Sequence, residues 1–426
     1  MSGWSRLARG STGAARWSLQ RIPARLLPIY ALVFVAGMLQ SALAPLGPLY
    51  AEHLHLSRVQ LGELFAVSGV STLLVVLPVG LFSDRIGSRR ISVGAAALIG
   101  LSALGQGLAS DFWLLLVSRL LFGVAFGAVW TAGVAYLSES GSAERRSARL
   151  GATIPVSGVS ASVGPAFAGV LAAQLGVGVP FAIIAAIAGL IAISLWRFPV
   201  LATPVARAEP ASAGSAWTAA RRSRLVVAPV VIMVTAGLSS SVTNLLAPIQ
   251  LRLNGASINA IGVLLAVAAV LYIASSLCVS RLGARAATVR AAGVATLLLG
   301  ASLVLPISSM ATVPLAAFVL VRSMVHATMS TIAYPIAAAA GETAGIGAAK
   351  ALGLTSAGWA TASVVGPLAG GAIAQAAGNR AAFAVLFPLT LIAAAWLLLG
   401  GRRLGDRSSE HRTPGRVLAG LGGPKP

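Results

Sequence analysis

Apolar stretches of about twenty residues recur along this chain from Leu27 to Gly400, and they contain almost no charge. A helix needs roughly 20 predominantly apolar residues to cross the hydrocarbon core of a bilayer. Of the 426 residues, 57% are hydrophobic and 10% are charged, whereas soluble domains contain about 25% charged residues. The sequence therefore predicts an all-α membrane protein.

Charged and turn-forming residues divide these stretches into twelve predicted spans. They cover residues 27–50, 59–82, 90–109, 112–137, 148–174, 178–197, 225–250, 258–280, 287–306, 312–337, 346–375 and 380–400. We expect two bundles of six helices, at 27–197 and 225–400. Residues 198–224 are rich in Pro, Ala and Ser, which is typical of a solvated linker between the bundles.

The basic residues indicate how the chain is oriented. Cytoplasmic segments of membrane proteins are enriched in Lys and Arg. Of the 31 basic residues, 26 fall on the side that holds the 1–26 and 401–426 tails and the linker. We therefore expect both termini to be cytoplasmic, in a bacterial cytoplasmic (inner) membrane. The Arg-rich first 26 residues also resemble a mitochondrial transit peptide, but the charge pattern favours a cytoplasmic tail.

The chain contains an internal repeat. LGATIPVSGVSASVGPAFAGVLAAQLG, which starts at Leu150, matches LGLTSAGWATASVVGPLAGGAIAQAAG, which starts at Leu352, at an offset of 202 residues. At nearly the same offset Arg119 in the fourth span matches Arg322 in the tenth. These matches indicate that the halves are parallel six-span repeats.

A charged motif, GLFSDRIGSRR, follows the second span. With the six-plus-six organisation and the central linker, this motif resembles the major facilitator superfamily of secondary transporters, and in particular its twelve-span drug and small-molecule proton antiporters. The resemblance implies two bundles that rock about a central site and a cytoplasmic latch between them. The positive-inside rule alone explains the arginines but not the acid or the glycine spacing. The residues expected to form this gating motif are Gly80, Asp84, Arg85, Gly87, Arg89 and Arg90.

The fifth span carries a second resemblance. Gly158, Gly164, Pro165 and Gly169 are similar to the glycine-rich motif that marks proton-exchanging exporters in this superfamily. Small residues in a membrane helix permit close packing, so the span is expected to act as a bendable seam. Alanines at positions 166 and 168 depart from the fuller pattern, and plain helix packing stays open as the alternative.

Arg119 lies inside the fourth span and begins RLLFGVAFG, in which Gly123 and Gly127 share one helix face. An arginine in hydrocarbon costs at least about 2.5–3.5 kcal/mol on insertion scales, so Arg119 should face the bundle interior and have a partner. Glu63 in the second span is the nearby acid. A purely structural Arg119–Glu63 ion pair and a proton-loading Glu63 influenced by Arg119 are both open.

Arg322 and His326 lie four residues apart and therefore share one face of the tenth span. Histidine titrates near neutral pH, so a coupling proton at His326 and a packing histidine are the alternatives. The proton-coupling candidates are thus Glu63, Arg119, Arg322 and His326. Polar and aromatic residues away from the predicted interfaces are candidates for a substrate cavity, and these are Gln40, Trp130, Asn244 and Trp359.

Several classes of function lack the residues they need. The sequence has no HExxH, no His/Cys cluster and no phosphate-binding loop, so an enzyme, a metal site, a cofactor and an ATP-driven transporter are not expected. Basic residues in short clusters between spans argue against a nucleic-acid partner. We expect a monomer that exports a small organic compound by proton-coupled alternating access. An importer of a small nutrient and a non-transporting membrane sensor or assembly partner are the alternatives.

Overall fold

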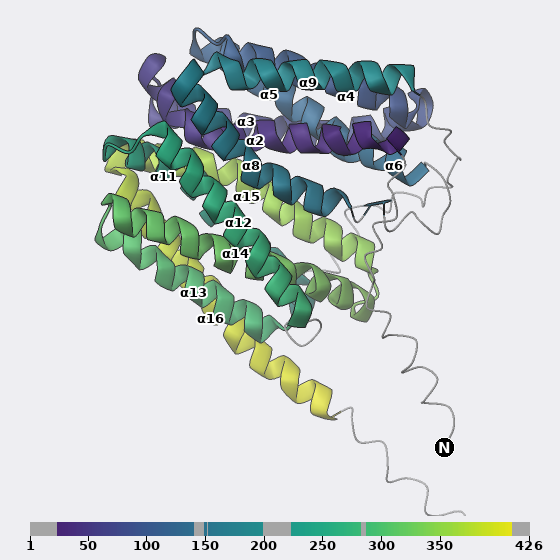
Figure 1. Ribbon diagram of the computed structural model, residues 1–426. Helices are drawn as coiled ribbons and strands as arrows, with labels where there is room; N and C mark the ends of the chain where they lie inside the picture. Colours follow the sequence, from purple (N-terminus) through teal and green to yellow (C-terminus); the bar gives the residue numbers. More distant parts are fainter. Residues whose placement is uncertain (1–23, 140–148, 151, 199–222, 283–286, 411–426) are drawn as a thin grey trace, which may run out of the picture.

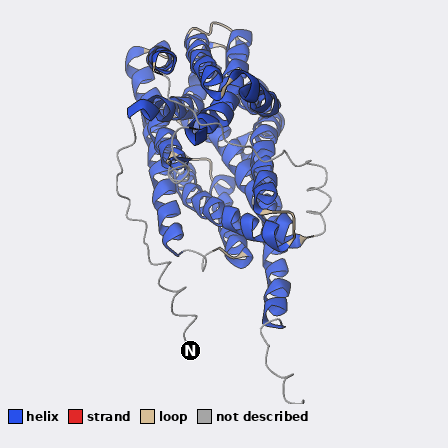
Figure 2. Ribbon diagram, turned by 90° about the vertical axis from the view of Figure 1, so that its right-hand side faces the viewer, coloured by secondary structure: helices blue, strands red, loops and turns tan. Residues whose placement is uncertain are grey.

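The structure is a computed structural model that describes residues 24–139, 149–150, 152–198, 223–282 and 287–410. Within these ranges the chain forms twelve long helices and no strand, which confirms the predicted all-α fold with two six-helix halves (Figures 1 and 2). Most of the predicted N-terminal tail, most of the linker and the end of the C-terminal tail lie outside the described residues.

The N-terminal half contains six spans that follow the short 3-10 turn η1 (Ala24–Leu26). They are α2 (Leu27–His53), α3 (Arg58–Ile86), α4 (Ser88–Gly107), α5 (Phe112–Ala128) with its continuation through η2 (Val129–Gly133) and α6 (Val134–Glu139), α8 (Thr153–Leu175) and α9 (Gly178–Arg197). The C-terminal half contains α11 (Arg224–Leu253), α12 (Ile258–Leu282), α13 (Val289–Ser308), α14 (Thr312–Thr343), α15 (Ala348–Ala377) and α16 (Asn379–Glu410).

Local sequence signals mark where these helices begin and end. Ser57 and Gln60 form a reciprocal capping box at the start of α3, and the Asp111 carboxylate accepts a hydrogen bond from the Leu114 amide at the start of α5. α8 ends at Gly176, where φ is +92°, a conformation that glycine adopts without strain. Every span begins within five residues of its predicted start.

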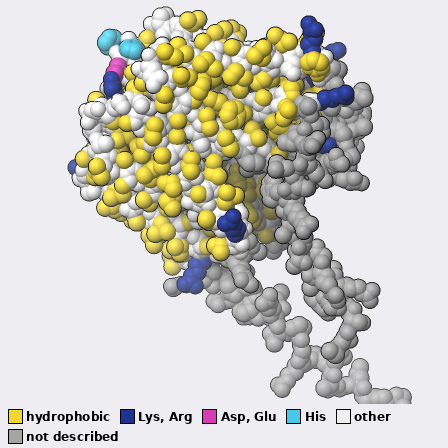
Figure 3. Space-filling view, viewed as in Figure 1, with side chains coloured by type: hydrophobic (Ala, Val, Ile, Leu, Met, Phe, Trp, Pro, Cys, Tyr) yellow, Lys and Arg dark blue, Asp and Glu magenta, His cyan; other side chains and the backbone are white. Residues whose placement is uncertain are grey.

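The surface of the molecule fits a bilayer. Within the described residues, eleven helices are long and apolar enough to cross a membrane. The remaining long helix, α4, is more polar because it carries Arg89, Arg90 and Gln106. Figure 3 shows a broad apolar face with the charged side chains gathered towards its margins. Large side chains such as Leu74 and Ile392 are exposed on the helices and would contact lipid.

The two halves meet mainly through two helix pairs, α3 with α15 and α8 with α12. We call the end of the molecule that carries the turns at 54–57 and 254–257 the closed end. The opposite end, where α2 begins and α16 extends past the other helices, is the tail end (Figure 1).

Both helix pairs contain the same tight contact near the closed end. A Cβ atom at Gly62 of α3 would lie 2.4 Å from the carbonyl oxygen of Pro367 in α15, and this contact defines the first seam. A Cβ atom at Gly262 of α12 would lie 2.7 Å from the carbonyl oxygen of Pro165 in α8, and this contact defines the second seam. Pro165 and Pro367 are matched positions of the internal repeat, so the two seams are related by the pseudo-symmetry of the halves.

Polar contacts add to the closure at this end. Arg252 of α11 donates two hydrogen bonds to the Glu52 carboxylate of α2, from Nε to Oε1 at 2.7 Å and from Nη2 to Oε2 at 3.1 Å. The Arg58 amide of α3 donates to Oε1 of Gln375 in α15 at 3.1 Å. Both contacts join the two halves, so the closed end is held by a bidentate ion pair as well as by close helix packing.

Candidate functional site

Arg119 is buried inside the N-terminal half. Only 1% of the residue is exposed, and Phe122 lies one turn away with its ring 4.9 Å from the guanidinium carbon. Its Nε donates to the Leu64 carbonyl at 3.2 Å and its Nη2 to the Ser68 hydroxyl at 2.9 Å. Among the described residues Nη1 has no partner. One edge of this guanidinium is therefore occupied by α3.

The glycines of the span-four motif explain how α3 comes so close to Arg119. A Cβ atom at Gly123 would lie 2.2 Å from the Ser68 carbonyl oxygen, and one at Gly127 would lie 2.6 Å from Cγ1 of Val75. The Thr72 hydroxyl donates to the Gly123 carbonyl at 2.8 Å. Small residues on α5 thus let α3 pack closely enough to supply acceptors to the arginine.

The structure does not form the Arg119–Glu63 ion pair that was one of the two alternatives. Both residues are described, and the guanidinium bonds to Leu64 and Ser68 instead. Leu64 and Ser68 are four residues apart and share one face of α3, whereas Glu63 is rotated from Leu64 by about 100° around the helix. Glu63 is half-buried and stays a candidate for proton loading.

An aromatic ladder continues from Arg119 towards the tail end. The Phe122 and Phe126 rings lie 5.5 Å apart, and the Phe126 and Trp130 rings lie 6.3 Å apart. Trp130 belongs to η2, a π-helical segment that interrupts the fourth span. Such segments are frequent at functional sites, and the sequence pattern gave no signal for this one.

Arg322 occupies the matching position in the C-terminal half and has a different environment. Only 4% of the residue is exposed, and within the described residues neither Nε nor Nη1 has a hydrogen-bond partner. These two nitrogens lie on different edges of the guanidinium, so both edges retain an unpaired donor. An unmade hydrogen bond of a buried group costs about 1–3 kcal/mol, and more when the group is charged.

Two aromatic rings from other helices flank His326 on the next turn of α14. The His326 ring stacks on Trp359 of α15 at 5.1 Å with an interplanar angle of 15°. Tyr272 of α12 meets the same imidazole edge-on at 5.3 Å. Arg322 lies one helical turn before His326 on α14, and both residues are buried. We call Arg322, His326, Tyr272 and Trp359 the arginine–aromatic cluster.

The cluster joins predicted residues with one that the sequence reasoning missed. Arg322, His326 and Trp359 were candidates, whereas Tyr272 was not, because it lies in an apolar span with no charge or polar periodicity to mark it. Gly237 of α11 makes room for the indole, since a Cβ atom there would lie 3.2 Å from Cε3 of Trp359.

The other two cavity candidates lie away from this cluster in sequence. Gln40 is exposed midway along α2, a helix that packs against α8 and α9 of its own half and α11 of the other. Asn244 of α11 is partly buried. Both residues lie on helices that connect the halves.

The gating motif spans the turn between α3 and α4. Gly87 has a φ of +94° and forms this turn. Arg89 donates from Nε to the Leu195 carbonyl at 2.8 Å and from Nη2 to the Trp196 carbonyl. These carbonyls end α9 of the same half, where a cation is favoured by the helix dipole. Arg85 and Arg90 are exposed, Gly80 is in ordinary contact with Thr131, and the Asp84 side chain lies outside the described residues.

The span-five glycines face two different neighbours. A Cβ atom at Gly164 would lie 2.1 Å from the Ser41 hydroxyl of α2, within the same half. Gly169 and Pro165 face Gly262 across the second seam, and Gly158 faces Ile273 of α12 at an ordinary contact distance. One face of α8 therefore packs on its own half and another on the opposite half.

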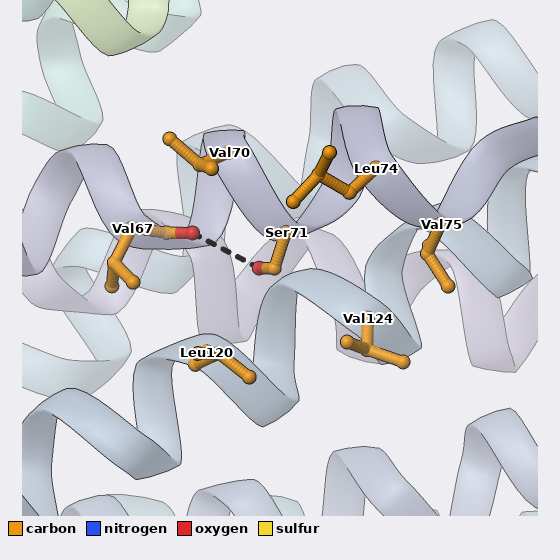
Figure 4. A pocket seen from close by; sticks show the side chains of 7 residues that line it. All are labelled: Val67, Val70, Ser71, Leu74, Val75, Leu120 and Val124. Atoms are coloured by element: carbon orange, nitrogen blue, oxygen red, sulfur yellow. Dashed lines mark hydrogen bonds between the residues drawn. The ribbon is translucent and has the colours of Figure 1, made fainter.

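A shallow pocket of about 250 Å³ lies elsewhere, between α3 and α5 (Figure 4). Apart from Ser71, its lining is aliphatic, and the Ser71 hydroxyl donates to the Val67 carbonyl at 3.0 Å. Leu74 and Val70 on its rim are exposed on the helix surface. The pocket lacks the charged and aromatic groups of the cluster, so it is not part of the candidate site.

The chemistry available at the candidate site is that of binding. In the part of the chain that the structure describes, no group of three His, Cys, Asp or Glu side chains could hold a metal ion. The cluster offers positive charge, hydrogen-bond donors and aromatic surface between helices, which are the features of a small-molecule site.

Comparison with known families gives a match over nearly the whole chain. The family model described as Major Facilitator Superfamily matches residues 29–238 and 229–422. The chain is 36% identical over 90 residues to the 3-(3-hydroxy-phenyl)propionate transporter of Escherichia coli K12. It is 27% identical over 162 residues to multidrug resistance protein 2 of Bacillus subtilis 168. These matches span 22% and 40% of the two relatives, and 21% and 38% of this chain.

Solved structures share the fold. An inward-facing, unoccupied bacterial homologue of the human lysosomal transporter Spinster has a TM-score of 0.74 at 15% identity, covering 90% of this chain and 97% of the other. The nucleoside transporter NupG has a TM-score of 0.69 at 11% identity, covering 88% of this chain and 99% of the other.

Proposed function

The chain belongs to the major facilitator superfamily, and we propose that this small-molecule transporter exports an organic compound across a bacterial cytoplasmic membrane in exchange for protons. The observation that carries the proposal is the pair of matched seams between the halves. Both seams lie at one end, where they bring the backbones of the two halves into close contact and seal the interface between them.

The candidate residues lie below this seal. Arg119 follows the start of α5 by seven residues, a depth of about 10 Å. His326 and Tyr272 each follow the start of their helix by fourteen residues, a depth of about 21 Å. A substrate held at this depth would exchange access between the two membrane faces as the seams open and close.

In this proposal the closed end faces the outside and the tails, the linker 198–224 and the gating motif face the cytoplasm. The charge pattern along the chain supports this orientation. Asp84 would latch the tail end when it closes, with Arg85 and Arg89 in the same network. The contact of Arg89 with α9 holds the α3–α4 turn against its own half.

Proton coupling would rest on two titratable groups beside two permanent charges. Glu63 lies next to the α3 residues that bind Arg119, and His326 lies one turn from Arg322. Each of these side chains can carry a proton, so in this proposal Glu63 and His326 are the two candidates for the coupling site.

The names of the relatives support transport of organic compounds, and one of them bears on direction. A relative named for multidrug resistance favours export. Uptake is the second candidate function, because another relative is named for transport of a sugar, D-xylose, at 28% identity over 95 residues, and sugars are nutrients. That match spans 21% of the relative.

Everted vesicles test coupling and direction together. Vesicles that contain the protein would be energised to an acid interior, and a pH-sensitive dye would report proton release as drugs, amphiphiles, sugars and organic acids are added. Substrate-dependent proton release in wild type, lost in Arg119→Met and kept in the exposed control Arg290→Met, is expected. Absence of release with every compound, together with compound accumulation in whole cells on expression, would contradict export and favour uptake.

A further inference from the structure

Arg322 differs from Arg119 in what it has left to bind. Arg119 gives Nε and Nη2 to acceptors on α3. Arg322 is also buried, but among the described residues its Nε and Nη1 are unpaired. The first arginine is used in packing its own half, whereas the second presents unpaired donors on both edges of its guanidinium.

No acid of the C-terminal half can neutralise Arg322. The sequence contains no Asp or Glu between Glu209 and Glu342, nor between Glu342 and Asp406. Glu342 is twenty residues beyond Arg322 on the same helix, a separation of about 30 Å. The membrane interior of this half therefore holds a permanent cation without a carboxylate.

A stripe of side chains leads from the tail end to this cation. Arg322, His326, Ser330 and Tyr334 recur every four residues along α14, and because each step turns about 40° around the helix axis, the row winds through about 120°. Their exposed fractions are 4%, 9%, 8% and 39% in that order. The stripe thus runs from an accessible tyrosine to a buried arginine, with the Trp359 and Tyr272 rings beside its middle.

We propose that the arginine–aromatic cluster binds the carboxylate of an organic anion that has an apolar or aromatic body. The carboxylate would accept hydrogen bonds from one edge of the Arg322 guanidinium, a geometry that arginine and carboxylate groups share. The body would lie against Trp359 and Tyr272. This assignment rests on the proposed transport function and names its substrate class.

A series of ligands that differ only in head group tests whether the cluster prefers a negatively charged ligand. Purified full-length protein in nanodiscs would be titrated calorimetrically with 4-phenylbutyrate, 4-phenylbutanamide and 4-phenylbutylamine, which share one body and differ in head group. The carboxylate is expected to bind at least tenfold more tightly than the amide, because it alone gains charge-assisted hydrogen bonds. The amine is expected to bind most weakly. Equal affinity for carboxylate and amide would overturn the inference.

Substitutions of Arg322 test whether this residue binds the carboxylate. Arg322→Gln should lower 4-phenylbutyrate affinity at least tenfold and leave amide affinity unchanged, whereas Arg322→Lys should retain part of the preference. Arg290→Gln makes the same change at an exposed position and should bind as wild type. Unchanged carboxylate affinity in Arg322→Gln would overturn the inference. If that variant does not fold, the ligand series with wild type decides.

Different results would overturn the proposed transport function and the proposed substrate class. Coupled transport of neutral or cationic compounds only, with no carboxylate binding, would overturn the substrate class and leave the transport function standing. Carboxylate binding that depends on Arg322, with no proton-coupled export, would overturn the transport function and leave the binding site standing.

Discussion

The first seam makes a quantitative prediction about the conformational equilibrium. In Gly62→Ala, the new methyl group would lie 2.4 Å from the Pro367 carbonyl oxygen, where ordinary contact begins at 3.4 Å. The obstacle is backbone, so α3 and α15 must separate by about 1 Å. Overpacking of this kind costs about 1–3 kcal/mol. The conformer closed at this end should therefore lose population by roughly 5- to 150-fold relative to the alternative.

Electron–electron distance measurements check this shift. Spin labels at exposed positions His53 and Leu253, introduced into a Cys278→Ser background, report the separation of the halves at the closed end. Gly62→Ala should broaden this distance distribution towards longer values. Gly262→Ala, with 2.7 Å to the Pro165 carbonyl oxygen, should act in the same direction with a smaller effect.

A glycine outside the seams supplies the control. Gly189 of α9 has no atom within 4 Å of its would-be Cβ, so Gly189→Ala should leave the distances unchanged and gain up to about 1 kcal/mol of helix stability. An unaltered distribution and melting temperature in Gly62→Ala would refute the reasoning, since the seam would then have room for a methyl group.

Three further predictions concern charges at the two ends. Glu52→Gln should change the ratio of closed to open conformers, measured with the same spin labels, by less than about fivefold. The reason is that an exposed ion pair is worth about 0.2–1 kcal/mol. The difference from wild type should shrink at high salt, and persistence there would contradict an ionic origin. Asp84→Asn should keep abundance and membrane insertion normal while cutting transport, and full transport would exclude the latch. Arg89→Gln should lower the melting temperature by removing bonds to the end of α9, with exposed Arg90→Gln as its control.

The spans were predictable because residues close to each end determine where the helix begins and stops. Ser57, Asp111 and Gly176 mark caps and turns between apolar stretches, and the helices begin close to where these signals place them. The ends are less predictable where a helix continues past its apolar run. α14 runs to Thr343 and α16 to Glu410, past the predicted ends at 337 and 400.

Contacts between spans were less accessible to sequence reasoning. The four-residue spacing of Arg322 and His326 placed them on one face of a helix, but the partners of that face depend on how three helices pack. Tyr272 carried no charge signal, and Trp359 was a candidate without its stacking partner. The Arg119–Glu63 pair failed because charge was weighed without the helical phase that turns Leu64 and Ser68 towards the guanidinium.

One part of each seam was visible in the sequence and the other was not. The internal repeat revealed that Pro165 and Pro367 are matched positions, yet the glycines that face them, Gly62 and Gly262, are far away in the chain. Their pairing follows from close approach between backbones, which no side-chain pattern records.

The isolated cation of the C-terminal half also makes the protein sensitive to voltage. An arginine remains charged at all physiological pH values, and Arg322 lies within a span of a half whose only acids, Glu342, Asp406 and Glu410, are at least twenty residues away in the chain. Moving one elementary charge across a membrane potential of 100 mV changes its energy by about 2.3 kcal/mol. Any rearrangement that alters the depth of Arg322 therefore performs electrical work in the empty transporter, and a bound anion that moves with it cancels that work.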